Sequence, residues 1–254
     1  MLLNDEIIEE LAGRVQQARR MVIFTGAGVS TDSGIPDFRS PGGFWTKHKP
    51  IEYREFLSSP ETRKEAWTRF FAIHDTITKA VPGETHRAIA RLAERGNVAR
   101  VITQNIDGLH QRAGVPHDQV IEIHGNGSLA RCLSCGARHE IAEVREAMME
   151  TGEPPACGTC GGIVKSATIS FGQAMPEQEM ADSRAATLDA DLFFAVGSSL
   201  QVFPAAGFPV TASHNHTPLV IINREPTGLD GLAQLVIHAD AGPVLGAVVA
   251  KLAN

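Results

Sequence analysis

The sequence predicts an α/β fold, in which a parallel β-sheet covered by helices on both faces is interrupted by one small inserted module. Short apolar runs alternate with segments of helical periodicity along most of the 254 residues, a pattern typical of such sheets. The apolar run at residues 21–25 leads directly into a glycine turn, as the first strand and helix of such a sheet do. All four cysteines lie between residues 126 and 173, where this alternation stops.

The predicted elements follow one another in a regular order. Residues 1–20 carry apolar side chains at helical spacing with charges between them, which predicts an amphipathic helix. Residues 40–85 are expected to be mainly helical, with a break at Pro41–Gly43, and residues 86–95 predict a further helix. The predicted strands of the sheet are 21–25, 99–103, 120–123, 192–196 and 219–222.

The composition of the chain limits the classes of function. Hydrophobic residues make up 43% and charged residues 20% of the chain, which indicates a packed core rather than disorder. The net charge of −6 and the pI of about 5.9 give no basic footprint, so no direct nucleic-acid binding is expected. No apolar run approaches the roughly 18 residues of a membrane span, and the acidic start of the chain differs from a signal peptide. We therefore expect no membrane association and a cytoplasmic location.

The cysteines form two Cys-x-x-Cys pairs, Cys132/Cys135 and Cys157/Cys160, separated by residues 136–156. Each pair supplies two thiolates from a tight turn, and the two pairs together complete a tetrahedron. Four cysteine ligands leave no open position for water, so the pattern predicts one structural Zn²⁺ rather than a catalytic one. A redox-active dithiol is the alternative, but that chemistry needs only one pair.

The glycine turn after the first strand reads Gly26–Ser30. Glycine lets the backbone approach a diphosphate closely, and the amides that follow can donate hydrogen bonds to it. An ordinary tight turn is the alternative, because Thr31 stands where the third glycine of the usual G-x-G-x-x-G pattern would be. Further along, Asp37 and Arg39 mark a loop in which they form either a ligand site or a simple surface ion pair.

Polar residues follow the other strands at their carboxyl ends, where open parallel sheets bind ligands. Gln104, Asn105 and Asp107 can hydrogen-bond sugar hydroxyls and an amide, although any turn rich in Asn, Asp and Gly has this composition. His124 directly follows the strand 120–123, and histidine is the usual general base because its ordinary pKa is about 6.5. The last two strands are followed by Gly197-Ser198-Ser199 and Asn223-Arg224-Glu225.

In this order, the motifs resemble those of the sirtuin family, the NAD-dependent protein lysine deacylases. They read GAGVS, GIPDFR, TQNIDGLH, IHG, two CxxC pairs, FG, GSS and INRE, and they cover nearly the whole chain. The resemblance implies a Rossmann-like large domain, residues 1–125 and 174–254, and a zinc-ribbon small domain, residues 126–173. It also implies that NAD and an acylated lysine of a protein substrate meet in the cleft between them. The implied reaction transfers the acyl group, expected to be acetyl, to ADP-ribose and releases nicotinamide and free lysine.

The resemblance also assigns roles to individual residues. His124 is implied to be the catalytic base, with Asn105 as a second catalytic residue. Ile106 and Asp107 are implied to hold the nicotinamide amide, and Gln104 is implied to face the nicotinamide ribose beside Asn105. Ser198, Ser199 and Asn223 are implied to bind the phosphate and adenosine portion, with Asp240 near the adenine. Other positions, among them Ala27, Thr31, Phe38 and Arg39, are implied to line the NAD site. The full implied NAD site is Gly26, Ala27, Gly28, Ser30, Thr31, Asp37, Phe38, Arg39, Gln104, Asn105, Ile106, Asp107, Gly197, Ser198, Ser199, Asn223 and Asp240.

The chain departs from the family pattern in places that concern the acyl group. Sirtuins that prefer succinyl groups carry Tyr-x-x-Arg in one helix, and alignment places Phe70 and Ile73 there, so a neutral acyl group is expected. The stretch Lys165–Gln173 keeps a Phe-Gly pair but lacks the Arg-Pro and the acidic residue common in the family. The alternatives are a protein ADP-ribosyltransferase, a non-catalytic NAD or acyl-lysine binding module, and a zinc-ribbon nucleic-acid binder. The intact set of Asn105, Asp107 and His124 favours deacylation.

Overall fold

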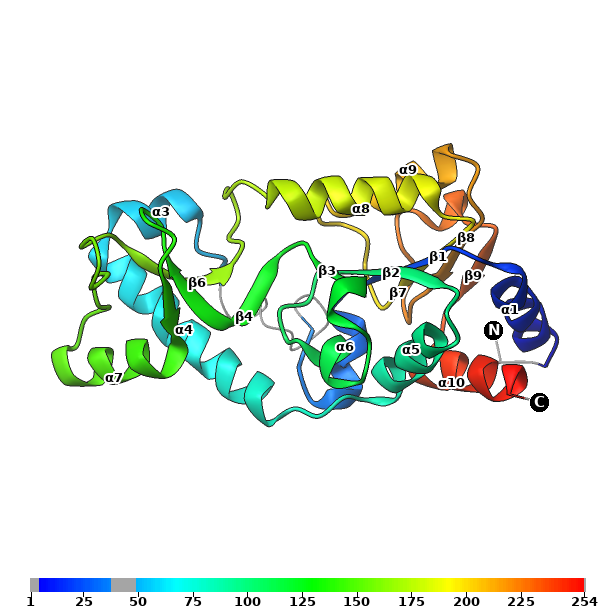
Figure 1. Cartoon of the computed structure of the whole chain (residues 1–254), viewed down its shortest axis with the longest axis horizontal. Coiled ribbons are helices and arrows are strands. Elements are labelled where there is room, and N and C mark those ends of the chain that lie inside the picture. Colours follow the sequence, from blue (N-terminus) through cyan, green and yellow to red (C-terminus); the bar gives the residue numbers. More distant parts are fainter. Residues whose placement is uncertain (1–4, 38–48, 254) are drawn as a thin grey trace.

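The structure, a computed structural model, describes residues 5–37 and 49–253. The described chain forms two lobes (Figure 1), a large one with a six-stranded sheet and a small one with a three-stranded sheet. Helices α1 (Asp5–Gln17) and α10 (Ala241–Leu252) lie at the end of the large lobe that is remote from the small lobe (Figure 1). The expected helical break at Pro41–Gly43 lies outside the described residues.

All six strands of the large sheet are parallel, in the order β3-β2-β1-β7-β8-β9. The five predicted strands are confirmed. The sixth strand, β9, is absent from the prediction, although its three apolar residues Leu235–Ile237 form a run as long as the predicted strand β3. The strands are β1 (Met21–Thr25), β2 (Val98–Thr103), β3 (Val120–Glu122), β7 (Leu192–Val196), β8 (Leu219–Ile222) and β9 (Leu235–Ile237).

The large sheet is buried on both faces, which explains why its strands are continuous apolar runs. Along β1, Met21 and Ile23 enter one hydrophobic cluster, and Val22 and Phe24 enter another on the opposite face. The first cluster is covered by α1, α10 and α5 (Glu84–Glu94), and the second by α8 (Glu177–Asp189) and α9 (Gly207–His214) (Figure 1). Within the described ranges, no helix has both the length and the apolar composition needed to cross a bilayer.

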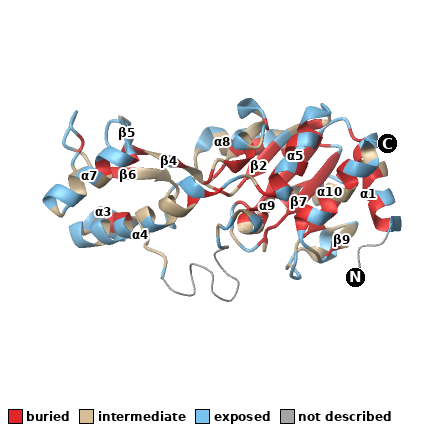
Figure 2. Cartoon of the chain, turned by 90° about the horizontal axis from the view of Figure 1, so that it is seen from below, coloured by how far each residue is buried: buried red, intermediate tan, exposed pale blue. Residues whose placement is uncertain are grey.

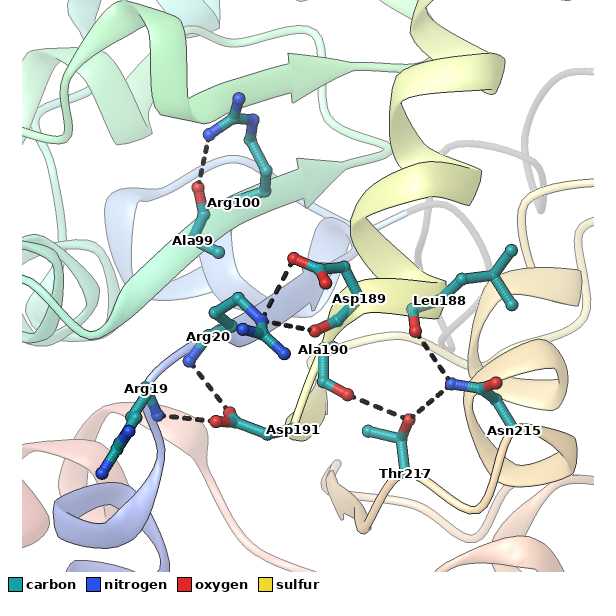
Figure 3. A network of polar contacts seen from close by, with 10 residues as sticks. All are labelled: Arg19, Arg20, Ala99, Arg100, Leu188, Asp189, Ala190, Asp191, Asn215 and Thr217. Atoms are coloured by element: carbon teal, nitrogen blue, oxygen red, sulfur yellow. Dashed lines mark hydrogen bonds and ion pairs between the residues drawn. The ribbon is translucent and has the colours of Figure 1, made fainter.

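A polar network fixes the amino ends of β1 and β7 against each other (Figure 3). The carboxylate of Asp191 accepts hydrogen bonds from the main-chain amides of Arg19 and Arg20, at 2.8 and 2.9 Å. The guanidinium of Arg20 donates to the carbonyl oxygen of Asp189 at 2.8 Å. The two strands are in register from Met21 opposite Leu192 to Thr25 opposite Val196, so their carboxyl ends lie side by side.

The small lobe contains the antiparallel sheet β5-β4-β6 and helix α7 (Ile141–Thr151). Its buried cluster is small, whereas the buried residues of the large lobe surround the whole sheet (Figure 2). The strands are β4 (Gly125–Cys132), β5 (Arg138–Glu140) and β6 (Val164–Thr168), and the remaining short elements of the described chain are η1 (Ala27–Ser33), α3 (Tyr53–Ser58), α6 (Leu109–Arg112), η2 (His117–Gln119) and η3 (Asp230–Leu232).

Helix α4 (Pro60–Lys79) packs against the small lobe, although the sequence assigns its residues to the large domain. Trp67 of α4 is 2% exposed and belongs to the same buried cluster as Val164 and two of the cysteines. Its indole nitrogen donates to the carbonyl oxygen of Val164 at 3.3 Å. The helix joins this cluster because its aromatic face finds apolar surface there, so the small lobe is built from two separate stretches of the chain. The expected domain limits at 126 and 173 stay a prediction.

Candidate functional site

A cleft of about 1120 Å³ lies between the lobes, along the carboxyl ends of β1, β2, β7 and β8. The sequence reasoning placed the ligand at this edge of the sheet, and all described residues of the expected site line the cleft. Phe38 and Arg39 lie outside the described residues. The lining residues of the expected site are Gly26, Ala27, Gly28, Ser30, Thr31, Asp37, Gln104, Asn105, Ile106, Asp107, His124, Gly197, Ser198, Ser199, Asn223 and Asp240.

The glycine turns after β1 and β7 pack directly against each other. The amide of Gly28 donates to the carbonyl oxygen of Gly197 at 2.8 Å, and a Cβ at Gly28 would lie 2.8 Å from that same oxygen. A Cβ at Gly26 would lie 2.8 Å from the Cβ of Ser198. The amide of Gly28 is therefore used inside the protein, in contrast to the expectation that it is free for a diphosphate. The glycines are required here because the two turns approach so closely.

A buried hydrogen-bond network orients the polar residues that follow β2. The hydroxyl of Ser30 donates to Asp107 at 2.7 Å and accepts from the side-chain nitrogen of Asn105 at 3.0 Å. The second carboxylate oxygen of Asp107 accepts from the amide of Leu109 at 2.9 Å. This arrangement leaves the side-chain oxygen of Asn105 without a partner among the described residues, and the carboxylate keeps further acceptor capacity. The residues therefore fit a ligand with sugar hydroxyls and an amide, such as the nicotinamide riboside half of NAD.

Two further polar layers support this network, and the sequence reasoning did not single them out. Thr25 donates to Thr103 at 2.8 Å and contacts the Nε2 atom of His110 at 2.9 Å. The Nε2 atom of His86 contacts Ser30 at 3.4 Å. Burial lowers the pKa of His110 to about 3, so this imidazole is neutral at physiological pH. Thr103 and His110 are the ends of the TQNIDGLH motif, but nothing in the local sequence shows that they, Thr25 and His86 are buried.

His124 has one ring nitrogen available as a base. Its Nδ1 atom lies 3.0 Å from the carbonyl oxygen of Gln104, and because a carbonyl can only accept, Nδ1 carries the proton. In the neutral ring, the Nε2 atom is then the proton acceptor. Burial lowers the pKa of His124, against the smaller opposite effect of the Gln104 carbonyl. The imidazole is therefore neutral and ready to accept a proton at physiological pH.

Contacts on both sides hold His124 in place. The side-chain nitrogen of Gln104 donates to the hydroxyl of Ser198 at 2.9 Å, which ties the segment after β2 to the segment after β7. The carbonyl oxygen of His124 accepts from the amide of Ile169 at 2.8 Å, which ties it to the segment after β6. The histidine is thus fixed from both lobes at once.

The small-lobe side of the cleft is largely apolar. Phe70 and Ile73 of α4 line it, so the positions aligned with Tyr-x-x-Arg do belong to the cleft. Arg69 also lines the cleft, but its guanidinium pairs with Glu65 and donates to the carbonyl oxygen of Lys49 at 2.7 Å. Lys165 lines the same cleft and is only 3% exposed. The sequence gives no sign of this burial, because lysine is almost always exposed.

The four cysteine sulfurs form a closed cluster in the small lobe, all within 4.8 Å of one another. The Sγ atoms of Cys132 and Cys160 are 3.5 Å apart, and those of Cys135 and Cys157 are 3.7 Å apart. A disulfide needs about 2.05 Å, whereas a tetrahedron with Zn–S bonds of about 2.3 Å has edges of about 3.8 Å. The site fits a structural Zn²⁺, and a redox pair would not require all four sulfurs to converge.

Comparisons with known proteins agree with this geometry. The sequence model of the Sir2 family matches residues 26–204. The NAD-dependent protein deacetylase of Rhodopseudomonas palustris is 50% identical over 242 residues, which are 95% of this chain and 96% of that protein. NAD-dependent protein deacetylase 1 of Bradyrhizobium diazoefficiens is 51% identical over 242 residues, 95% of each chain. A solved complex of a Sir2 protein with a deacetylated p53 peptide and 3′-O-acetyl ADP ribose is 33% identical, with a TM-score of 0.87 over 96% of this chain and 98% of the other.

The chain is thus similar over almost its full length to proteins of one family. The chain belongs to the Sir2 family, the sirtuins.

Proposed function

We propose that this protein is an NAD-dependent protein lysine deacetylase in which His124 is the catalytic base. The observation that carries the proposal is the fixed protonation of that imidazole, with Nδ1 held by the carbonyl oxygen of Gln104 at 3.0 Å. His124 lines the cleft together with every described residue of the expected NAD site. Relatives that are 50% and 51% identical carry the name NAD-dependent protein deacetylase.

Different groups of cleft residues would bind different parts of NAD and the acylated lysine. Asn105 and Asp107, fixed through Ser30, would hold the nicotinamide riboside portion of NAD together with Gln104 and Ile106. Residues from the other strand ends would hold the rest of the molecule, and Asp240, paired with Arg224 at 2.6 Å, would lie beside the adenine. The acylated lysine of a protein substrate would enter from the small-lobe side, between α4 and the segment after β6. The full set proposed for the diphosphate and adenosine portions is Gly26, Ala27, Gly28, Thr31, Asp37, Phe38, Arg39, Gly197, Ser198, Ser199, Asn223 and Asp240.

In this arrangement, the protein supplies orientation and one proton acceptor. NAD, when bound, supplies the ribose carbon to which the acyl oxygen bonds and the nicotinamide that leaves. The Nε2 atom of His124 takes the proton of a ribose hydroxyl, which allows a hydroxyl to attack the acyl carbon. The side-chain oxygen of Asn105 is oriented by its bond to Ser30 to bind the sugar. Water then releases free lysine and O-acetyl-ADP-ribose.

Zinc has a structural role in this proposal. Four cysteine ligands leave no coordination position for substrate or water. The cluster joins the end of β4 to the start of β6 through Cys132, Cys157 and Val164, against Trp67 of α4. The metal would therefore hold the small-lobe wall of the cleft together. We also propose a cytoplasmic location, because four thiolates persist most readily in a reducing compartment.

The activity is tested by mass spectrometry of an acetylated lysine peptide incubated with the protein and NAD. The wild type is expected to yield deacetylated peptide, nicotinamide and O-acetyl-ADP-ribose. His124→Ala is expected to lower kcat/KM by about 10²–10⁴-fold, because it removes a general base, while NAD binding by calorimetry changes little. His214→Ala, an exposed histidine remote from the cleft, is the matched control. Wild-type turnover by His124→Ala would disprove the assignment.

The pH dependence of kcat/KM reports the state of the same base. Only neutral His124 can accept a proton, and burial lowers its pKa, so activity is expected to persist at weakly acidic pH. Activity should then fall as the pH drops through the lowered pKa, below the ordinary value of about 6.5. The measurement is the acid limb of the kcat/KM profile between pH 5 and 8, with stability checked at each pH. An acid limb above pH 7 would contradict this prediction.

Zinc removal should be visible at Trp67, which packs in the same cluster as Cys132 and Cys157. The chain has two tryptophans, so Trp45→Phe leaves Trp67 as the single reporter. A strong chelator is expected to shift its emission to longer wavelength and lower the midpoint of thermal unfolding, because metal binding here contributes folding free energy. Metal analysis should give one zinc per chain. Freshly purified protein that is fully active without zinc would refute the structural role.

The acyl group is expected to be neutral. Phe70 and Ile73 offer no cation in the cleft, the guanidinium of Arg69 is already paired with Glu65, and the ammonium of Lys165 already donates to two main-chain carbonyl oxygens. Burying an unpaired carboxylate is unfavourable, so kcat/KM for an acetyl peptide should exceed that for the matching succinyl peptide by about tenfold or more, or about 1.4 kcal/mol. The two peptides are compared side by side on one backbone. Equal rates would mean that a cation of the cleft wall, Arg69 or Lys165, receives the carboxylate.

A further inference from the structure

Lys165, in the middle of β6, is a buried cation without a carboxylate partner. Its side chain lines the cleft and is 3% exposed. The Nζ atom donates to the carbonyl oxygens of Thr168 at 2.5 Å and Ser166 at 3.4 Å, and it lies 5.9 Å from the centre of the Phe56 ring. No described carboxylate lies within ion-pair distance, and residues 1–4, 38–48 and 254, which the structure does not describe, contain no Asp or Glu.

A buried ammonium with only carbonyl partners is unfavourable for folding. Removal from water destabilises the charged form, and burial lowers the pKa of Lys165 to about 8. A lysine with this pKa is still largely protonated at pH 7. An apolar side chain of similar length would fill the same space beside Phe56 without this penalty. The charge at this position is therefore explained better by function than by stability.

Thr168, whose carbonyl oxygen accepts from the ammonium of Lys165, is the first residue of a segment that forms one wall of the cleft. Residues 168–173 all line the cleft, directly after β6. The contacts that hold this wall include three to other parts of the chain: Lys165 holds the carbonyl oxygen of Thr168, the amide of Ile169 donates to the carbonyl oxygen of His124, and the amide of Tyr53 donates to the carbonyl oxygen of Phe171 at 2.8 Å. Thr168 is also held by its hydroxyl, which lies 2.9 Å from that of Ser166, and by the pairing of β6 with Gly125 of β4. The contact next to it, at Ile169, is made to the proposed base.

We propose that Lys165 is a positioning residue for the acylated substrate, which acts by holding the Thr168 carbonyl and, through it, the cleft wall at residues 168–173. The inference rests on the proposed deacetylase function. Because the wall belongs to the small-lobe side, it borders the space for acyl-lysine. The expected NAD contacts follow β1, β2, β7 and β8 of the other lobe, or lie at Asp240 just after β9. Loss of the ammonium should therefore weaken the use of peptide and leave the use of NAD unchanged.

The test compares three variants with the wild type. Lys165→Met keeps the length of the side chain and removes the charge and the donors. Lys165→Arg keeps both. Lys64→Met removes a half-exposed lysine of α4 that pairs with Glu153 and serves as the matched control. Each protein is assayed for the KM of an acetylated peptide, the KM of NAD, kcat and the midpoint of thermal unfolding.

Lys165→Met is expected to unfold at the wild-type temperature or higher and to raise the KM of the peptide by about tenfold, with the KM of NAD within about twofold. Lys165→Arg should restore the peptide KM, and Lys64→Met should match the wild type. A wild-type peptide KM in Lys165→Met would overturn the proposal. A lower unfolding temperature with both KM values raised together would also overturn it, because that result marks a purely structural residue. Absence of deacetylation by the wild type would instead refute the proposed function itself.

Discussion

The contact between the two glycine turns determines the geometry of the cleft. Gly28 donates to Gly197 at 2.8 Å, and a Cβ at Gly26 or Gly28 would collide with the turn after β7. Gly197 itself has a φ of +59°, a conformation that is strained for other residues. Only because these side chains are absent can the ends of β1 and β7 meet. The side chain of Gln104 can then donate to Ser198, and the carbonyl oxygen of Gln104 accepts a hydrogen bond from the Nδ1 atom of His124.

The proposed catalytic histidine lies where the two lobes join. His124 lies directly between β3 of the large sheet and β4 of the small sheet. Its ring is fixed by the large lobe through Gln104, and its main chain is fixed by the small lobe through Ile169. A change in the packing of the small lobe is therefore transmitted to the base through the backbone itself. Four cysteine ligands leave zinc no open position for chemistry. Through this link, however, the packing around the cysteine cluster can affect the position of His124.

The sequence predicts those parts of the molecule whose signals are local. An apolar run followed by glycine or by polar residues marks a strand and its ligand-binding end. All five strands predicted in this way are present, and the described residues of the expected site line the cleft. Cysteine spacing is likewise a local signal, and the four sulfurs converge. Trp67 packs against Val164, which is 97 positions away in the sequence. Lys165 is buried beside Phe56, which is also distant in the sequence. No periodicity within one window contains that information.

Three histidines lie in or near the cleft, but their surroundings distinguish one of them as the proposed proton acceptor. His86 and His110 lie close to the same network as Ser30 and Thr25, and each is a candidate base by residue type alone. Both are buried, and burial lowers the pKa of each, so neither carries charge at physiological pH. Their Nε2 atoms are directed at hydroxyl groups inside the protein. Among the described histidines, His124 is the one that lines the cleft, with its free nitrogen not engaged in any such contact. All three imidazoles have a lowered pKa, so the engaged Nε2 atoms of His86 and His110 and their absence from the cleft lining, rather than their neutrality, separate them from the proposed base His124.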